Sequence, residues 1–515
     1  MDLQKRLDFI SETKKKIFEV SENNKKKTAI ERMNLLFDEG TFVAVKSFVK
    51  KRTNEFPEND KNDKNDKNDN EYEGIVAGYG SVDGKLVFAY SQDFSKKSGA
   101  ISEAGIKKIL ALYSMAEKNG APVVSIFDSS GVDITEGIDA LAGYGAIINK
   151  ASVLSGVIPQ YSAICGTCAG GAAVIASISD FIFAEKNNGK IFINPPFVIK
   201  NKSEKIIDNI GSADFAAETG QAAKVFDSEN ELFASLKKLI EYIPSNNLDD
   251  NIYLPELCSG YANDDFNRLT ENLADYVLTE KYDMKQVITE IADNNKFFEV
   301  YENYSPNVIC GFISVANTAV GVVANQPKEN DGMICPGVCD KAARFIYVCD
   351  NFNMPVLTLV DTEGMVISEK AENAQFALYA AKLSSAYASA AVPKITLNIG
   401  KAYGAAYVIM GSKGLGTDIV MAYPTTQISI VPPETAGEII YGEEIAKDPN
   451  PAEKRAELLE TWEIEKSSPV EAASNGSIDN IIEPKETRKM IASAILMLDS
   501  KREIRPAKKY NKLPL

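Results

Sequence analysis

The feature that most constrains this fold is an internal repeat, because the order of patterns in the first half of the chain returns in the second. In each half, two segments with strand-like alternation precede a stretch with helical spacing, and a solidly apolar strand follows. The apolar strands are APVVSIFDSSG (121–131) and MPVLTLVDTEG (354–364), and each contains an aspartate near its end, Asp128 or Asp361. A repeat of this length predicts two related domains.

The repeat continues through a turn of small residues that follows each apolar strand. CAGGAAVIAS (168–177) in the first half matches KAYGAAYVIM (401–410) in the second. The glycines Gly171 and Gly404 each lie 43 residues after the aspartate of their own strand. Strands and helices with several connections too long for hairpins predict an α/β fold for both halves.

The limits of the two domains follow from a polar stretch around LTENLADYV, where we place the boundary near residue 275. The domains are then 1–275 and 276–515. Within the first, PENDKNDKNDKNDNEYE (57–73) has the composition of a low-complexity polar loop. Such a segment buries too little apolar surface to pack, so we expect a surface loop without catalytic residues.

The composition excludes several classes of function. The chain has 515 residues, a net charge of −16 and no histidine. Nucleic acid and an anionic membrane are therefore disfavoured as partners, and Ser-His-Asp hydrolysis and histidine-ligated metals are removed. The longest uncharged run, 151–179, contains Pro159 and several glycines, so we expect a buried strand, a glycine turn and a helix, with no membrane span.

The cysteines predict the compartment. Seven cysteines, an odd number, are scattered through a chain whose first twenty residues do not resemble a signal peptide. We expect reduced thiols and a cytoplasmic protein. The close pairs Cys165 with Cys168 and Cys335 with Cys339 favour buried apolar side chains over ligands, so we expect no metal site.

The candidate chemistry lies at the two turns of small residues. Gly170 and Gly171 in the first half, and Gly404, Ala405 and Ala406 in the second, stand where an apolar strand gives way to a helix. Unpaired amide groups at a helix start can stabilise an oxyanion, and one such donor contributes roughly 3 kcal/mol in a dry site. Close helix packing is the alternative for either turn alone, but two turns at equivalent positions favour two oxyanion holes.

Several long motifs occur in a fixed order along the chain. They are ERMNLLFDEGTF (31–42), GYGSVDGKLVFAYSQDF (78–94), TEGIDALAGYG (135–145), CAGGA (168–172), FFEVYENY (297–304), VANQP (323–327), KAARFIYVCDNFNMPV (341–356) and GKAYGAAY (400–407). These motifs resemble those of the biotin-dependent acyl-CoA carboxyltransferases, which include the β subunits of propionyl-CoA and acetyl-CoA carboxylases and the carboxyltransferase subunits of methylmalonyl-CoA and glutaconyl-CoA decarboxylases. The resemblance runs from about residue 28 to the end, including the closing RPAKKYNKLPL.

The resemblance implies two tandem crotonase-like domains in a homo-oligomer such as a hexamer, with each site between the N-terminal domain of one subunit and the C-terminal domain of another. Gly170 and Gly171 would stabilise the enolate of a coenzyme A (CoA) ester, and Ala405 and Ala406 after Gly404 would hold the ureido oxygen of biotin. The residues implied to bind substrate are Ser98, Gly99, Ala100, Gly131, Ala142, Gly143, Tyr144, Gly364 and Val408.

The resemblance also implies the cofactor and the partners. No biotin attachment sequence of the AMKM type and no biotin carboxylase domain occur in the chain, so biotin must arrive on another polypeptide. The expected partners are a biotin carboxyl carrier protein and either a biotin carboxylase or a membrane decarboxylase subunit. Because the bound biotin can itself take the α-proton of the acyl group, no protein base is required, which agrees with the absence of histidine.

Some positions depart from the family pattern. Asp133 stands where the family usually has arginine, Ser130 and Ala405 replace glycines, Val408 replaces an aspartate associated with acyl-chain selection, and 362–365 replaces a Pro-Gly-Phe segment. CPGVC (335–339) replaces an Asp-x-Asn stretch. Acetyl-CoA, propionyl-CoA and glutaconyl-CoA stay open as substrates.

Two alternatives to an active carboxyltransferase follow from these observations. The first is a catalytically degenerate paralogue that acts as a structural partner subunit. The second is a crotonase-like hydratase or isomerase, for which Glu136 and Glu363 are the available carboxylates.

Overall fold

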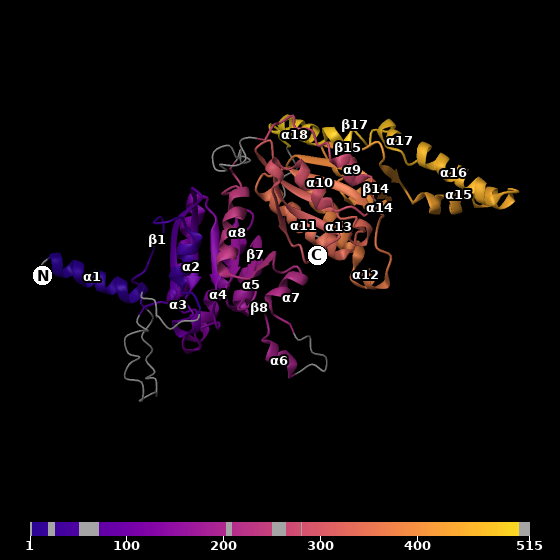
Figure 1. The fold of residues 1–515 in the computed structure, drawn as a ribbon. Helices are drawn as coiled ribbons and strands as arrows, with labels where there is room; N and C mark the ends of the chain where they lie inside the picture. The colour runs from indigo at the N-terminus through magenta and orange to yellow at the C-terminus, as the bar shows by residue number, and fades with distance from the viewer. Residues whose placement is uncertain are drawn as a thin grey trace. The chain divides into compact units, whose positions relative to one another are not determined.

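The computed structural model divides the chain into two compact units, Met1–Asp249 and Asp250–Leu515 (Figure 1). It describes residues 3–18, 26–50, 72–201, 209–249, 264–279 and 281–503. Most of the predicted loop 57–73 and the closing segment 505–515 lie outside these residues, and so does Cys258. Among the helices that the structure describes, none is both long and apolar enough to cross a membrane.

The N-terminal unit is built on a mixed sheet with the strand order β1-β2-β3-β4-β5-β7-β9. Neighbours from β1 to β3 are antiparallel and all later neighbours are parallel. A separate parallel pair, β6 and β8, carries the chain into α5. The strands are β1 (Val43–Ala44), β2 (Ile75–Val82), β3 (Lys85–Gln92), β4 (Val123–Phe127), β5 (Gln160–Ile164), β6 (Thr167–Ala169), β7 (Phe181–Glu185), β8 (Lys190–Phe192) and β9 (Lys224–Phe226). The helices are α1 (Leu3–Phe18), α2 (Ala29–Leu36), α3 (Glu103–Asn119), α4 (Ile138–Leu154), α5 (Gly171–Ile178), α6 (Pro196–Lys200), α7 (Ala213–Glu218) and α8 (Glu229–Tyr242).

The C-terminal unit repeats this sheet in the order β10-β11-β12-β13-β14-β15-β17, with β16 paired to the end of β14. The strands are β10 (Phe297–Val300), β11 (Val308–Val315), β12 (Thr318–Asn325), β13 (Val356–Thr362), β14 (Lys394–Tyr403), β15 (Ile419–Ala422), β16 (Gln427–Ser429) and β17 (Asn480–Ile481). The helices are α9 (Leu273–Val277), α10 (Met284–Ile291), α11 (Pro336–Asn351), α12 (Glu369–Asn373), α13 (Phe376–Ser389), α14 (Gly404–Ile409), α15 (Pro433–Lys447), α16 (Pro451–Glu465), α17 (Pro469–Ser474) and α18 (Thr487–Leu498). The predicted duplication is therefore a repeat of the same strand order.

Helix α3 shows why the sequence folds this way locally. The Ser102 side chain caps its first turn, and Gly120 ends it in the left-handed conformation. Its apolar side chains recur at helical spacing and are buried, with Ile109 and Leu112 completely shielded from solvent. Burying each such side chain stabilises the fold by roughly 1.5–3 kcal/mol. The helix thereby fixes the position of the loop before it, which belongs to the candidate site.

The division between the units falls earlier than the boundary near residue 275. The Thr270 N–H donates to the Lys485 carbonyl at 2.8 Å, and its hydroxyl donates to the Pro484 carbonyl at 2.7 Å. The Arg268 guanidinium donates to the Ala292 carbonyl at 3.0 Å. The segment before residue 275 therefore packs with the C-terminal unit, through contacts far away in the sequence that its polar composition does not reveal.

Candidate active site

The same polar arrangement closes the apolar strand in each unit. The Asp128 N–H donates to the Gln92 side chain at 3.1 Å, and the Asp361 N–H donates to the Asn325 side chain at 3.4 Å. A glycine faces each carboxylate, Gly166 or Gly400, and a Cβ built on either one would overlap the carboxylate oxygens. Each aspartate is therefore held in place at the end of its strand, where the next loop begins.

The loop after each aspartate is held by a hydroxyl. The Gly131 N–H donates to the Ser129 hydroxyl at 3.0 Å, and the Gly364 N–H donates to the Thr362 hydroxyl at 3.1 Å. Gly131 has a φ of 121° and Gly364 a φ of 126°, a region that residues with a side chain rarely adopt. The departure at Thr362 thus preserves the loop geometry, because threonine supplies the hydroxyl that serine supplies in the first unit.

A left-handed turn runs beside each of these loops. Lys97, Ser98 and Gly99 have φ values of 46°, 52° and 68°. The segment 330–332 in the second unit repeats them at 48°, 51° and 64°. The Ile101 N–H, after Ala100, donates to the Gly131 carbonyl at 2.9 Å. Consecutive left-handed residues outside glycine are strained and concentrate at functional sites. Ser98, Gly99, Ala100 and Gly131, predicted to bind substrate, are therefore brought into one loop pair.

The two helix-start turns also match. Gly170, immediately before α5, and Gly404, at the start of α14, both have a φ of 58°. The amide groups of the next residues lie in a first helical turn, where no intrahelical acceptor exists. Ala405 is not among the residues with positive φ, so the alanine that replaces a glycine keeps its N–H without strain.

These turns correct the predicted register by one residue. The structural counterpart of Gly404 is Gly170, since they share the left-handed conformation, whereas the equal spacing of 43 residues aligned Gly404 with Gly171. The second unit holds one extra residue between its aspartate and its turn, and this residue lies in the connection before β14, because Val356 pairs with Lys394, 38 residues later, whereas Val123 pairs with Gln160, 37 residues later. A count of residues from the aspartate does not show where in the connection such a residue is added.

Helix α4 packs on the first turn. The Tyr144 ring lies against Gly171, where an added Cβ would come within 2.8 Å of a ring carbon. The Tyr144 hydroxyl is buried without a hydrogen-bond partner among the described residues, and burial raises its pKa. Gly143 instead faces the Ile106 side chain of α3, so helix packing accounts for this glycine. Ala142 is exposed on α4.

Val408 lies on the outer side of α14 and is 49% exposed. Val174 occupies the same place on α5, four residues after its left-handed glycine, and is 39% exposed. Each helix-start turn therefore has an exposed valine beside it.

Asp133, which stands where the family usually has arginine, has a cationic partner in the neighbouring loop. Its carboxylate lies 3.3 Å from the Lys97 ammonium and accepts the Thr135 N–H at 3.1 Å. Burial opposes ionisation, but the bonds from Thr135 and the Lys97 charge outweigh it and lower the pKa of Asp133. A cation is thus present at this loop, on Lys97 rather than at position 133. No sequence motif indicates Lys97 as this partner, because 36 residues separate the pair.

The carboxylates that a hydratase would need are already engaged. Glu136 accepts the Glu103 N–H at 2.5 Å, and Glu363 forms an ion pair with Lys401 at 2.6 Å. Both therefore have structural partners.

Among the described residues, no group of three or more acidic or cysteine side chains could hold a metal ion. Cys165, Cys168, Cys310, Cys339 and Cys349 are buried free thiols, and Cys335 is partly buried.

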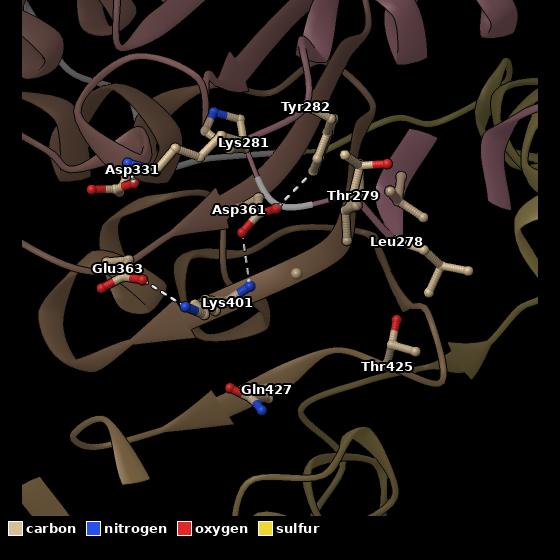
Figure 2. Close-up of a pocket in the computed structure, with 14 residues that line it drawn as sticks. Leu278, Thr279, Lys281, Tyr282, Asp331, Asp361, Glu363, Lys401, Thr425 and Gln427 are labelled. Atoms are coloured by element: carbon tan, nitrogen blue, oxygen red, sulfur yellow. Dashed lines mark hydrogen bonds and ion pairs between the residues drawn. The ribbon is translucent and has the colours of Figure 1, made fainter. Parts of the chain in front are cut away.

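A cavity of about 380 Å³ opens in the C-terminal unit beside Asp361 (Figure 2). Figure 2 shows the Asp361 carboxylate between the Tyr282 hydroxyl, which donates at 2.8 Å, and the Lys401 N–H, which donates at 2.9 Å. The Lys401 side chain reaches Glu363, and Lys281 pairs with Asp331 at 3.1 Å. Burial raises the pKa of Asp361. Each lysine that lines this cavity is neutralised by an acid, so the cavity offers no unpaired cation to an anion. No sequence motif indicates this cavity.

The fold and the two matching turns define the class of protein. The model of the carboxyl transferase domain family matches residues 21–513, and the chain belongs to this family. The chain is a carboxyltransferase with two crotonase-like domains, as the sequence predicted.

Three known proteins give the degree of similarity. The chain is 40% identical to the methylmalonyl-CoA decarboxylase subunit alpha of Propionigenium modestum, over 95% of this chain and 93% of the relative. It is 38% identical to the propionyl-CoA carboxylase beta chain of Saccharopolyspora erythraea, over 95% of this chain and 91% of the relative. A solved transcarboxylase 12S structure with methylmalonyl-CoA bound, described as a hexamer assembly, superposes with a TM-score of 0.91 at 34% identity, over 100% of this chain and 99% of that one.

Proposed function

We propose that this chain is the carboxyltransferase subunit of a biotin-dependent complex, and that it moves a carboxyl group between carboxybiotin and the α-carbon of propionyl-CoA. The observation that carries the proposal is the pair of helix-start turns with the same left-handed glycine, Gly170 and Gly404. The relatives named for propionyl-CoA and methylmalonyl-CoA support this acyl group over acetyl-CoA and glutaconyl-CoA.

The first turn serves the acyl-CoA. When the α-proton leaves, negative charge develops on the thioester oxygen, and the first-turn N–H groups after Gly170 donate to it. Each donor contributes roughly 3 kcal/mol of transition-state stabilisation. The Tyr144 ring, packed against Gly171, holds this turn in place. The loop pair of Ser98, Gly99, Ala100 and Gly131 positions the substrate.

The second turn serves biotin. Its residues fit the group, because Ala405 and Ala406 carry small side chains and lie in a first helical turn, whose N–H groups have no intrahelical acceptor. Bound biotin supplies the transferable carboxyl group and the atom that takes the α-proton. The N–H groups of Ala405 and Ala406 would hold its ureido oxygen, and the Gly364 loop and Val408 would contact it. The chain itself thus contributes alignment and dipoles.

Biotin reaches this site on a separate carrier protein, and the chain forms a homo-oligomer, with a hexamer as the preferred state. The further partner is a biotin carboxylase or a membrane decarboxylase subunit. The hexamer named for the transcarboxylase supports the oligomer. A cytoplasmic location is supported by the free thiols of the described cysteines.

The experiment is turnover of methylmalonyl-CoA and malonyl-CoA by the purified chain, with and without free biotin. We expect decarboxylation only with biotin, and faster with methylmalonyl-CoA. Loss of CoA ester at the same rate without biotin would contradict carboxyl transfer. A folded chain that binds CoA esters and turns over neither substrate would replace this proposal with the role of a structural partner subunit.

A further inference from the structure

The Asp361 carboxylate joins three segments of the C-terminal unit. Its Oδ1 atom accepts the Lys401 N–H at 2.9 Å, and its Oδ2 atom accepts the Tyr282 hydroxyl at 2.8 Å. Figure 2 shows the carboxylate between these two donors, at the wall of the cavity. Asp361 belongs to β13, Lys401 belongs to β14, and Tyr282 comes just before α10. One side chain therefore connects two neighbouring strands with the segment that precedes α10.

These contacts lie directly before the second helix-start turn. Lys401 stands three residues before Gly404, the left-handed glycine of that turn. The neighbouring Gly400 packs so closely on Asp361 that an added Cβ would overlap the carboxylate oxygens. In the other direction, the chain reaches the Gly364 loop three residues after Asp361. The carboxylate therefore holds together the two segments that the proposed biotin site combines.

We propose that Asp361 and Tyr282 are positioning residues for the second turn, in which the ionised carboxylate holds the strand that leads to Gly404 and the Tyr282 hydroxyl holds the carboxylate. Neither side chain takes part in the chemistry. The inference rests on the proposed use of this turn for biotin, whereas the contacts themselves do not depend on it. It follows that the affinity for biotin should depend on the protonation of Asp361.

The surroundings of Asp361 make its charge sensitive to pH. Burial raises the pKa of Asp361, and the charge of Glu363 acts in the same direction. The hydrogen bonds from Lys401 and Tyr282 and the Lys401 charge lower this pKa, but burial outweighs them. A protonated acid gives up the charge-assisted hydrogen bond that holds Lys401, so the anchor weakens as the pH falls through this pKa. The titratable side chains that line the cavity with Asp361 are Tyr282, Lys401 and Glu363, together with Lys281 and Asp331, which pair with each other.

The first unit serves as an internal control. There the equivalent carboxylate, Asp128, pairs with two cations, the Arg32 guanidinium at 3.0 Å and the Lys26 ammonium at 3.1 Å. The Asp128 and Arg32 side chains are completely shielded from solvent. We therefore expect no such pH dependence on the acyl-CoA side. As the pH falls, KM for free biotin should rise while KM for methylmalonyl-CoA stays constant.

Steady-state kinetics of methylmalonyl-CoA decarboxylation test the two residues, with the concentration of free biotin varied between about pH 5 and 8. In Tyr282→Phe, KM for biotin should rise roughly tenfold, as loss of a hydrogen bond to a charged group implies. The further rise toward acidic pH should begin at a higher pH than in the wild type, because the ionised carboxylate has lost a donor. In Asp361→Asn, KM for biotin should be high at every pH, since the amide does not titrate. KM for methylmalonyl-CoA should be unchanged in both variants.

Tyr387→Phe is the matched control. It removes the hydroxyl of another buried tyrosine, which bonds to the Thr358 hydroxyl at 2.9 Å. Thr358 lies on β13 like Asp361, so Tyr387→Phe and Tyr282→Phe lose equivalent groups beside the same strand. The control should keep KM for biotin and the pH profile of the wild type. An equal rise of KM in both tyrosine variants, or an unshifted pH profile in Tyr282→Phe, would overturn the proposal.

Hydrogen exchange, measured by mass spectrometry, gives a readout that does not depend on turnover. Peptides that cover 400–406 should exchange faster in Tyr282→Phe and Asp361→Asn than in the wild type, while peptides that cover 166–172 should not change. Circular dichroism checks that all variants fold. A wild type without biotin-dependent turnover would contradict the proposed function, and the exchange at 400–406 would still decide whether Asp361 anchors this strand. Unchanged exchange at 400–406 in both variants would overturn the proposal.

Discussion

The Arg32 guanidinium lies 3.0 Å from the Asp128 carboxylate, and both side chains are completely shielded from solvent. Glu229 lies 2.9 Å from the same guanidinium, and the partly exposed Lys26 lies 3.1 Å from the Asp128 carboxylate. In the second unit the equivalent carboxylate, Asp361, is held by the Tyr282 hydroxyl instead. Duplicated units have thus kept the buried carboxylate and changed its partner from a cation to a phenol.

Removing this cation should destabilise the N-terminal unit. In Arg32→Met, Asp128 and Glu229 lose their shared buried partner, and such losses lower the free energy of unfolding by about 3–5 kcal/mol. Lys186→Met is the control, because Lys186 is half exposed and pairs with Asp227 at 3.6 Å. We expect less than about 1 kcal/mol there. Denaturant unfolding measures both, and similar losses would show that the buried pair has no special weight.

The glycine that faces Asp128 should not tolerate a side chain. In Gly166→Ala, the new Cβ overlaps the carboxylate, so we expect a loss of about 1–3 kcal/mol in unfolding free energy. Gly145, inside α4, has open space around its Cβ position and no positive φ. Gly145→Ala should therefore stabilise the protein by up to about 1 kcal/mol. Thermal unfolding of the two variants gives the comparison, and a neutral Gly166→Ala would contradict the observed close approach.

Because Lys108 is buried, the free energy of unfolding should change with pH in the alkaline range. Its ammonium donates to the Ile75 carbonyl, and burial, partly offset by Glu73, lowers its pKa to about 8. In the unfolded chain the pKa of lysine is about 10.4. Between these values the unfolded state binds more protons, so the free energy of unfolding rises with pH, by up to about 3 kcal/mol.

Lys108→Met should abolish this rise, because the variant has no group there to titrate. Lys107→Met on the same helix is the matched control, since the Lys107 side chain is 71% exposed. Urea unfolding at several pH values from 7 to about 10.5 covers the window between the two pKa values. A slope in Lys108→Met equal to that of the wild type would assign the rise to another group.

The amide of Ala405 should matter for catalysis. Ala405→Pro removes one N–H while proline remains acceptable in a first helical turn. We expect the biotin-dependent rate to fall by about 100-fold, as loss of one oxyanion donor implies, with KM for the acyl-CoA unchanged. Ala405→Ser keeps the N–H and should stay within a few fold of the wild type. Equal losses in both variants would indicate a steric effect.

The sequence by itself determined the duplication, the α/β class, the family and the polar ends of the two apolar strands. These features are local patterns or long ordered motifs, so they can be recognised in the sequence without knowing which distant residues are in contact. The loops that carry Gly131 and Gly364, and the two turns of small residues, were also visible as motifs. Their roles in binding stay predictions.

The tertiary structure decided what depends on distant residues. The counterpart of Gly404 is Gly170, because the connection between β13 and β14 is one residue longer than the connection between β4 and β5. The cation beside Asp133 comes from Lys97, and the partner of Asp128 comes from a helix 96 residues earlier. Such partners are brought together by tertiary packing, because an unpaired buried charge is costly. The spacing of residues along the chain does not predict which of them will pair.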